Sequence, residues 1–391
     1  MQAALLVAAV VFLALAFHPF TSYPLSLALL VRFRPRPLAL HGTIDPATAR
    51  VALCVCAYNE AGVIRAKAEN MLLMRRLVPN LRLHLYLDCP SDGTAAIAAG
   101  FADRIDVVAA TERHGKTHGM NLLVERADAE FVVFSDANVM FEPDAVARLL
   151  APFADPAVGC VCGQLVYTGA DGSATAATGS LYWRLEERIK ASEGATGSIM
   201  GADGSIFAIR RALHRPPRPD LIDDMTVSLS ILCDGHRIVR AANAVAREGL
   251  VSRPGEEFRR KVRIACQAFN VHRTLWPRLR RLPPLALYMY LSHKLVRWFA
   301  GPLLGVGGLL LLAGLVAAGH PVVAAVLVGC ALLGLAAALL RPSSLPGKLL
   351  DILLAFVATA LGVWRSLRGE RFQTWSPPAS ARDGLSPVSE P

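Results

Sequence analysis

The segment Phe131–Asn138, which reads Phe-Val-Val-Phe-Ser-Asp-Ala-Asn, constrains the fold of this chain more than any other. Large apolar residues with β preference run directly into the polar tip Asp136-Ala-Asn138, as at the end of a buried parallel strand. In open α/β sheets, ligands bind just beyond the carboxyl ends of such strands. Carboxylate and amide oxygens at that edge suit a divalent cation that keeps waters and shares the oxygens of a bound phosphate. The segment therefore predicts an α/β fold with a phosphate-bearing ligand at the sheet edge.

Strand and helix signals alternate between about residues 48 and 250, which favours a mostly parallel sheet with covering helices. Strands are expected at Val51–Ala57, Leu81–Leu87, Ile105–Ala110, Phe131–Ser135 and Val158–Val166. Helices are expected over Glu60–Leu77, after Asp92, and over Lys116–Ala127. The first strand is not followed by G-x-G-x-x-G, and the sequence has no P-loop, so a dinucleotide-binding fold lacks its phosphate loop.

The two ends of the chain are much more apolar than the middle, and they raise the mean hydropathy of the whole to +0.40. Residues 1–31 are predicted to be an uncleaved transmembrane anchor, because they lack a basic start and a small-residue cleavage site. Arg32, Arg34 and Arg36 follow at once, which by the positive-inside rule places the chain from residue 32 onward in the cytoplasm. Residues 302–340 are predicted to form two transmembrane helices that meet at a His320-Pro321 turn.

Two further apolar segments near the C-terminus mix hydrophobic and charged residues. Residues 285–300 combine aromatic and basic side chains, which suits an interfacial helix. Residues 349–364 are short and contain Asp351, so they are expected to be an interfacial, re-entrant or third C-terminal membrane segment. The tail 375–391 is rich in Pro and Ser and is expected to be disordered. The predicted location is the inner (plasma) membrane, with several passes and a cytoplasmic domain at about 46–281.

Basic residues are concentrated in one region of a chain whose formal net charge is +10. The region Arg210–Arg281 holds 15 arginines and one lysine against seven acidic residues. Contact with anionic membrane lipids and a diphosphate ligand explains this excess better than nucleic acid, so no nucleic acid partner is expected. The eight cysteines show no C-x-x-C pairs and are interpreted as reduced core thiols.

Polar groups follow the ends of the other predicted strands as well. The first strand runs into Tyr58-Asn59-Glu60, the second into Asp88 and a Ser-Asp-Gly-Thr turn, and the third precedes a loop that ends at Gly115-Lys116. Each could merely cap a helix or close a turn. Lys116, however, stands where a phosphate can meet a helix N-terminus.

In this order and spacing, the four segments resemble the membrane-bound family 2 inverting glycosyltransferases with a GT-A fold. The resemblance covers roughly residues 50–300 and continues through Gly201-Ala-Asp203-Gly204-Ser205 and Ile222-Asp223-Asp224. It implies an α/β GT-A domain, a nucleotide-diphospho-sugar donor and Mg²⁺ or Mn²⁺ as cofactor. It further implies a substrate-binding set and a metal pair. The substrate-binding residues would be Tyr58, Glu60, Asp88, Lys116, Asn121, Asp136 and Gly204, and the metal ligands Asp136 and Asn138.

The adjacent pair Asp223-Asp224 supplies the candidate general base, since inverting transfer needs a carboxylate that takes the proton of the acceptor hydroxyl. We expect Asp224 to be the base and Asp223 to be the alternative. Neighbouring carboxylates point in different directions, so one can face the sugar while the other caps the helix that follows. Both could also be ordinary N-terminal helix carboxylates.

A basic segment occupies the place of the family's Gln-x-x-Arg-Trp motif. Arg263 matches its arginine, Arg260 stands where Gln is usual, and Ile264 replaces Trp. Arg260 and Arg263 lie on one helix face, where they could bind either the donor diphosphate or lipid phosphates. In processive synthases that Trp is the stacking surface for the terminal sugar, so its loss disfavours a polysaccharide-extruding enzyme.

The sequence thus predicts an enzyme that transfers a single sugar to a membrane-embedded acceptor in exopolysaccharide or glycolipid assembly. The acceptor is expected to be lipid-linked, a polyprenyl-linked oligosaccharide first and a glycolipid of the glucosylceramide kind second. Two alternatives remain: a processive polysaccharide synthase, and a catalytically inactive nucleotide-sugar-binding membrane scaffold.

Overall fold

The computed structural model describes residues 1–168, 174–249 and 254–374. The predicted disorder of the tail 375–391 falls outside the described residues. Within them, one mixed sheet has the strand order β3-β2-β1-β4-β7-β6-β8-β5. The strands are β1 Val51–Ala57, β2 Leu81–Leu87, β3 Asp106–Ala109, β4 Phe131–Asp136, β5 Val139–Phe141, β6 Val158–Thr168, β7 Ile206–Arg210 and β8 Arg237–Gly249.

The first half of the sheet is parallel and the second half is mixed. Strands β1, β2, β3 and β4 run parallel, whereas β7 is antiparallel to both β4 and β6, and β5 is antiparallel to β8. The register of β1 and β4 places Cys56 opposite Asp136. The polar residues that end these two strands therefore meet at one edge of the sheet, as predicted.

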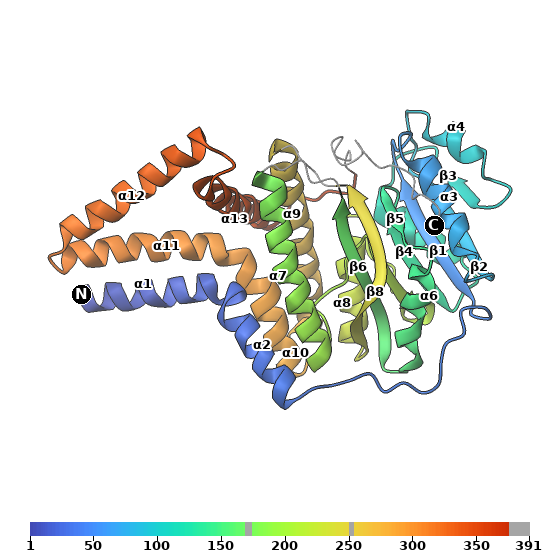
Figure 1. Ribbon diagram of the computed structural model, residues 1–391, viewed down its shortest axis with the longest axis horizontal. Coiled ribbons are helices and arrows are strands. Elements are labelled where there is room, and N and C mark those ends of the chain that lie inside the picture. Colours follow the sequence, from blue (N-terminus) through green and yellow to red (C-terminus); the bar gives the residue numbers. More distant parts are fainter. Residues whose placement is uncertain (169–173, 250–253, 375–391) are drawn as a thin grey trace.

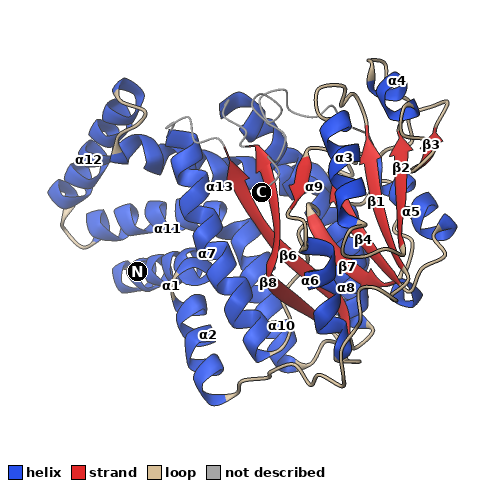
Figure 2. Cartoon of the chain, turned by 45° about the vertical axis from the view of Figure 1, so that its right-hand side comes forward, coloured by secondary structure: helices blue, strands red, loops and turns tan. Residues whose placement is uncertain are grey.

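Helices cover both faces of the sheet because successive strand residues alternate between the faces. Val132 and Phe134 of β4 belong to a core that includes residues of α5, α8, α9 and α10, whereas Phe131 and Val133 belong to a core that includes residues of α3 and α6. The layers are visible in Figure 2. The helices are α3 Ile64–Met74, α4 Thr94–Ala99, α5 Lys116–Arg126, α6 Ala145–Leu150, α7 Ala174–Thr196, α8 Asp223–Cys233, α9 Pro254–Leu279 and α10 Pro284–Tyr290.

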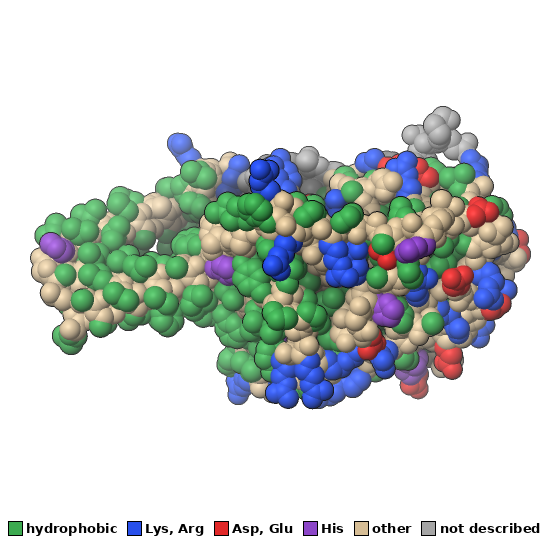
Figure 3. All heavy atoms as spheres, turned by 90° about the horizontal axis from the view of Figure 1, so that it is seen from below, with side chains coloured by type: hydrophobic (Ala, Val, Ile, Leu, Met, Phe, Trp, Pro, Cys, Tyr) green, Lys and Arg blue, Asp and Glu red, His purple; other side chains and the backbone are tan. Residues whose placement is uncertain are grey.

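An arm of long helices projects from the α/β domain (Figure 1). It is formed by α1 Gln2–Phe17, α11 Val296–Ala317 and α12 Pro321–Leu340, with α2 Ser22–Phe33 and α13 Leu345–Leu367 at its base. Large hydrophobic side chains such as Val10, Leu309 and Val322 are exposed on the arm. Figure 3 shows hydrophobic side chains along the arm, with backbone and other uncharged atoms between them.

Within the described residues, four helical segments are long and apolar enough to cross a membrane by length and composition. They are Gln2–Phe20, Pro284–Ala317, Pro321–Leu340 and Leu345–Leu367. The segments predicted separately at 285–300 and from 302 onward form one 34-residue helical run, with a π-helical turn at Leu291–Leu295. Helix α13, predicted over 349–364, buries Ala358, Gly362 and Val363 while its Leu353 and Val357 are exposed.

Candidate active site

Lys116 lies at the centre of the polar edge of the sheet. It is the first residue of α5, preceded by Gly115 with φ of 87°. Its Nζ lies 2.7 Å from Asp136 Oδ1 and 3.3 Å from Asp223 Oδ2. Burial opposes the charge of Lys116, but Asp136 and Asp223 outweigh that effect and raise its pKa. One ammonium therefore ties the end of β4 to the start of α8, and we call Lys116, Asp136, Asp223 and Asp224 the Lys116 cluster.

The two adjacent carboxylates of α8 face different neighbours, as the sequence predicted. Asp223 is almost fully buried and faces Lys116. Asp224 turns toward Gly204, where an ideal Cβ would stand 2.9 Å from Asp224 Oδ2. The N-cap residue Ile222 makes no side-chain capping hydrogen bond, and Asp224 Oδ1 accepts the first-turn N–H of Met225 at 2.6 Å. Glycine at 204 leaves the room that the Asp224 carboxylate occupies.

The environment of Asp224 suits a proton acceptor. Burial raises the pKa of Asp224 to about 7, and the neighbouring Asp223 carboxylate adds to the shift while Lys116 opposes it. A carboxyl group with a pKa near neutrality matches the requirement for general base catalysis at physiological pH. Asp223 is held by Lys116, so Asp224 fits the role of base better.

Tyr58 and Asp88, two of the predicted nucleotide-binding residues, contact the loop that precedes α5. Asp88 Oδ1 accepts the backbone N–H groups of His114 at 2.8 Å and Gly115 at 3.0 Å, and Arg113 Nε lies 3.6 Å from Asp88 Oδ2. The Arg113 guanidinium also lies over the Tyr58 ring, 3.6 Å from its centroid. Asp88 thus positions the loop before α5. Arg113, for which the sequence analysis predicted no role, contacts both Tyr58 and Asp88. Its position in the loop that leads to Lys116 is the sequence feature that could have identified it.

Glu60 and Asn121 contribute hydrogen bonds that hold neighbouring segments. Glu60 is buried, and its backbone N–H donates to Thr94 Oγ1 at 2.7 Å. Asn121 Nδ2 donates to the Pro217 carbonyl at 2.8 Å and so anchors the segment before α8. Neither of these two hydrogen bonds involves a residue of the Lys116 cluster.

Asn138 and Asp136 are the candidate metal ligands. Asn138 Nδ2 donates to Glu248 Oε1 at 3.1 Å, which leaves its amide oxygen as a donor atom for a cation. No group of three or more His, Cys, Asp or Glu side chains suited to a metal occurs in the described part of the chain. The three carboxylates of the Lys116 cluster nevertheless exceed the charge of its lysine. The residues therefore fit Mg²⁺ or Mn²⁺ if further ligands come from phosphate and water.

The two predicted arginines of α9 lie beside this edge. Arg260 Nη1 lies 3.4 Å from Glu257 Oε2, and Arg263 Nη1 donates to Gln267 Oε1 at 3.1 Å. Burial lowers the pKa of Arg263 to about 10 and Arg260 adds to that shift, whereas Asp136 opposes it. Arg263 is thus within electrostatic reach of the end of β4, where the diphosphate of a donor would be anionic.

The comparisons with known proteins agree with a GT-A fold. Residues 52–216 match the model of glycosyl transferase family 2. A mannosyltransferase from Pyrobaculum calidifontis, solved with GDP-Man and Mn²⁺, superposes with a TM-score of 0.71. That likeness covers 94% of this chain and 99% of the other at 22% sequence identity, so it extends through the helical arm. Residues 52–216 are therefore similar to the family 2 glycosyltransferases, as predicted, and the predicted fold class is confirmed.

The curated relatives match a smaller part of this chain than the mannosyltransferase structure does. An N-acetylglucosaminyltransferase of Rhizobium sp. (strain N33) is 24% identical over 65% of this chain and 59% of its own length. The O-antigen chain rhamnosyltransferase WbaN of Salmonella anatum is 28% identical over 44% of this chain and 57% of its own length. The chain thus matches less than three fifths of the length of either relative.

Proposed function

We propose that this protein is an inverting glycosyltransferase that moves one sugar from a nucleotide-diphospho-sugar to a lipid-linked acceptor in the membrane. The observation that carries the proposal is the contact of Lys116 with both Asp136 and Asp223. It joins the strand end where a diphosphate and a cation would bind to the helix start that carries the candidate base. A scaffold that only bound nucleotide sugars would not need a candidate base beside the diphosphate site.

The donor would lie along the carboxyl ends of β1, β2 and β4. Tyr58 and Arg113 form the wall where the base and ribose would stack, and Asp88 holds the loop that completes it. Lys116 and Arg263 would face the diphosphate. Mg²⁺ or Mn²⁺, held by Asp136 and Asn138, would neutralise the charge of the departing nucleoside diphosphate.

Asp224 would take the proton of the acceptor hydroxyl. The acceptor oxygen then forms a bond to the anomeric carbon while the bond from that carbon to the donor phosphate oxygen breaks on the opposite face, which inverts the configuration. The proton ends on the Asp224 carboxylate and the electron pair leaves with the nucleoside diphosphate. A base whose pKa lies near 7 can accept and later release this proton at physiological pH.

The helical arm supports an acceptor that resides in a membrane. Four candidate spans and a basic segment after α2 favour several passes and a cytoplasmic catalytic domain, because Arg32, Arg34 and Arg36 follow the first span directly. Ile264, in place of the tryptophan that holds a growing chain in processive synthases, supports single transfer.

The experiment is a donor screen with purified protein in detergent. UDP- and GDP-sugars are supplied with Mn²⁺ or Mg²⁺ and a membrane lipid extract, and release of nucleoside diphosphate is measured. Release from one donor is expected, and Asp224→Asn should abolish it. Asp144→Asn, a change of the same chemistry outside the site, is the matched control and should retain release. Donor binding without release by the wild type would contradict the proposal.

A further inference from the structure

A second buried group of charges lies at the elbow where the α/β domain meets the helical arm. Its basic residues come from the π-helical turn Leu291–Leu295, the start of α11 and α7, and its acidic residues from α7 and the loop before β7. π-Helical turns often occur at functional sites. We call the seven residues the elbow cluster: Glu186, Lys190, Glu193, Asp203, His293, Lys294 and Arg297.

Most members of the elbow cluster are closely paired. His293 Nδ1 lies 2.6 Å from Glu193 Oε1, and His293 Nε2 lies 2.9 Å from Glu186 Oε1. Arg297 Nη1 lies 2.6 Å from Glu186 Oε2, and Lys190 Nζ lies 2.5 Å from Asp203 Oδ2. Lys294 differs from them, because its Nζ is 4.0 Å from Glu186, whose Oε1 already faces His293.

Lys294 is the least closely paired cation of the elbow cluster. The Glu186 carboxylate, 4.0 Å from its Nζ, also contacts His293 and Arg297. An ammonium group without a close carboxylate can be neutralised by an anion from outside the protein.

Lys294 points toward the Gly201–Ser205 loop, whose Gly204 lies against the candidate base Asp224. An ideal Cβ on Gly201, whose φ is 112°, would stand 4.0 Å from Lys294 Cε and equally far from Ser228 Oγ. That hydroxyl accepts the Ala202 N–H at 3.1 Å and donates to the Asp224 carbonyl at 2.6 Å. The Lys294 side chain is 23% exposed, more than Arg297 at 14% and His293 at 1%.

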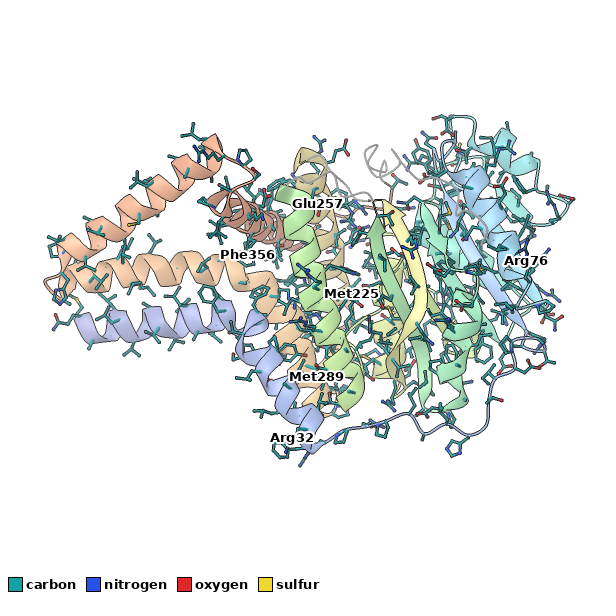
Figure 4. The ribbon with its side chains drawn as sticks, in the orientation of Figure 1. Arg32, Arg76, Met225, Glu257, Met289 and Phe356 are labelled. Carbon is teal, nitrogen blue, oxygen red and sulfur yellow. The ribbon has the colours of Figure 1, made fainter. Side chains whose placement is uncertain are left out.

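The elbow joins the α/β domain, which carries the candidate base, to the apolar helical arm. Met225, next to Asp224, and Met289, just before the π-helical turn, belong to one hydrophobic core and are labelled in Figure 4. Beyond the turn, α11 continues into the arm beside α1 (Figure 1). An amphiphile whose tail lies along the arm would bring its head group to Lys294 and its sugar to Asp224.

We propose that Lys294 binds a phosphate group of the acceptor, so that the acceptor is a lipid phosphate rather than a neutral glycolipid. This inference rests on the proposed function and adds the chemical class of the acceptor to it. The phosphate replaces the missing close carboxylate of Lys294 as a charge-assisted hydrogen-bond acceptor. The sugar hydroxyl of the same lipid then meets Asp224 across the Gly201–Ser205 loop.

The test is a binding measurement on the purified full-length protein with farnesyl monophosphate as probe and farnesol as its uncharged match. Farnesyl monophosphate should bind the wild type more tightly than farnesol. Lys294→Ala should weaken its binding about tenfold, as expected for one charged hydrogen bond. Lys294→Arg should bind within a few-fold of the wild type, and Lys348→Ala, a cation at another membrane edge, should equal the wild type.

A second measurement distinguishes binding at the donor site from binding at Lys294. Lys294→Ala should retain donor-nucleotide binding, whereas Lys116→Met should lose donor binding and keep binding the probe. Equal affinity of wild type and Lys294→Ala for the probe would overturn the inference. So would equal competition by inorganic phosphate, which indicates a free-anion site, or by phosphatidylglycerol vesicles, which indicates a general lipid contact. Failure of the proposed function would show instead as absent donor turnover in the wild type, whatever the probe does.

Discussion

The Lys116 cluster and the elbow cluster both bury charged side chains, yet they differ in which charge is poorly paired. In the Lys116 cluster three carboxylates neighbour one lysine, with Arg263 nearby. In the elbow cluster Lys294 lies 4.0 Å from a carboxylate that also contacts His293 and Arg297. Carboxylates in excess favour a bound cation, whereas an ammonium group without a close carboxylate favours a bound anion. The contrast suggests a division of labour, with a metal and a base on the donor side and a lipid phosphate on the membrane side.

The two clusters are nevertheless connected. Asp203 pairs with Lys190 of the elbow cluster and raises the pKa of Asp224, after the larger effects of burial and Asp223. Asp203, in the Gly201–Ser205 loop, thus contacts the elbow cluster and acts electrostatically on the candidate base. The following predictions test whether the two sites act separately, and they run from the largest expected effect to the smallest.

Asp224→Asn should lower kcat by at least about a hundredfold, because general base catalysis commonly contributes a factor of about 100 to 10,000. The KM for the donor should change little, since the side chain is proposed to act on the acceptor. Steady-state release of nucleoside diphosphate measures both. A large rise in donor KM with unchanged kcat would instead assign Asp224 to donor binding.

Lys116→Met should abolish donor binding and reduce stability. Its removal leaves Asp136 and the nearly buried Asp223 without their cation, which typically costs about 3 kcal/mol for a buried pair. Thermal unfolding in detergent and nucleotide titration give the two readouts. The double variant Lys116→Met/Asp223→Asn should recover stability but not binding; recovery of both would contradict a direct role for Lys116.

The pH profile of kcat/KM should rise about tenfold per unit up to about pH 7 and then level off, since the carboxylate of Asp224 is the active form. Stability should respond in the opposite direction. A carboxyl group whose pKa is raised in the folded state stabilises the protein below its unfolded pKa, and this contribution is lost as the pH rises through the folded value. Asp224→Asn should therefore raise the melting midpoint at pH 8 more than at pH 5. A flat profile would contradict the proposed base.

Gly204→Ala should lower kcat about tenfold with the fold intact, because its Cβ would stand 2.9 Å from Asp224 Oδ2 and displace that carboxylate. Displacements of about 1 Å can cost up to about a hundredfold in rate. Gly197→Ala is the matched control, since an ideal Cβ there meets no atom within 4 Å. Equal activity of the two variants would show that Asp224 does not need its present position.

The parallel half of the sheet could be predicted from local sequence because its strands are continuous apolar runs. The expected bounds of the first two strands, Val51–Ala57 and Leu81–Leu87, match those of the structure, and the polar tip of the fourth was found for the same reason. The sequence analysis did not predict β5, β7 or β8. Strand β8 in particular contains three arginines and pairs with strands far away in the sequence, so periodicity carries little signal there.

The individual residues of the candidate site could be predicted from the sequence, but the contacts between them could not. Turn chemistry at strand ends pointed to Asp88, Lys116 and Asp136. It could not show that Lys116 contacts Asp223, more than 100 positions away, because that contact depends on how α8 packs against α5. The elbow cluster was invisible for the same reason. From the sequence alone, His293, Lys294 and Arg297 are interpreted as charges of an interfacial helix. The structure shows that carboxylates of α7 face them.

The most direct test of the central claim is transfer of label from a nucleotide sugar, radiolabelled in the sugar, into lipid. Purified protein, Mn²⁺ and a membrane lipid extract are incubated with the donor, and radioactivity in the organic phase is counted for wild type and Asp224→Asn. We predict label in the lipid phase for the wild type and background for the variant. Equal label in both, or donor binding with no labelled lipid from any UDP- or GDP-sugar, would contradict the assignment of the Lys116 cluster as a glycosyl transfer site.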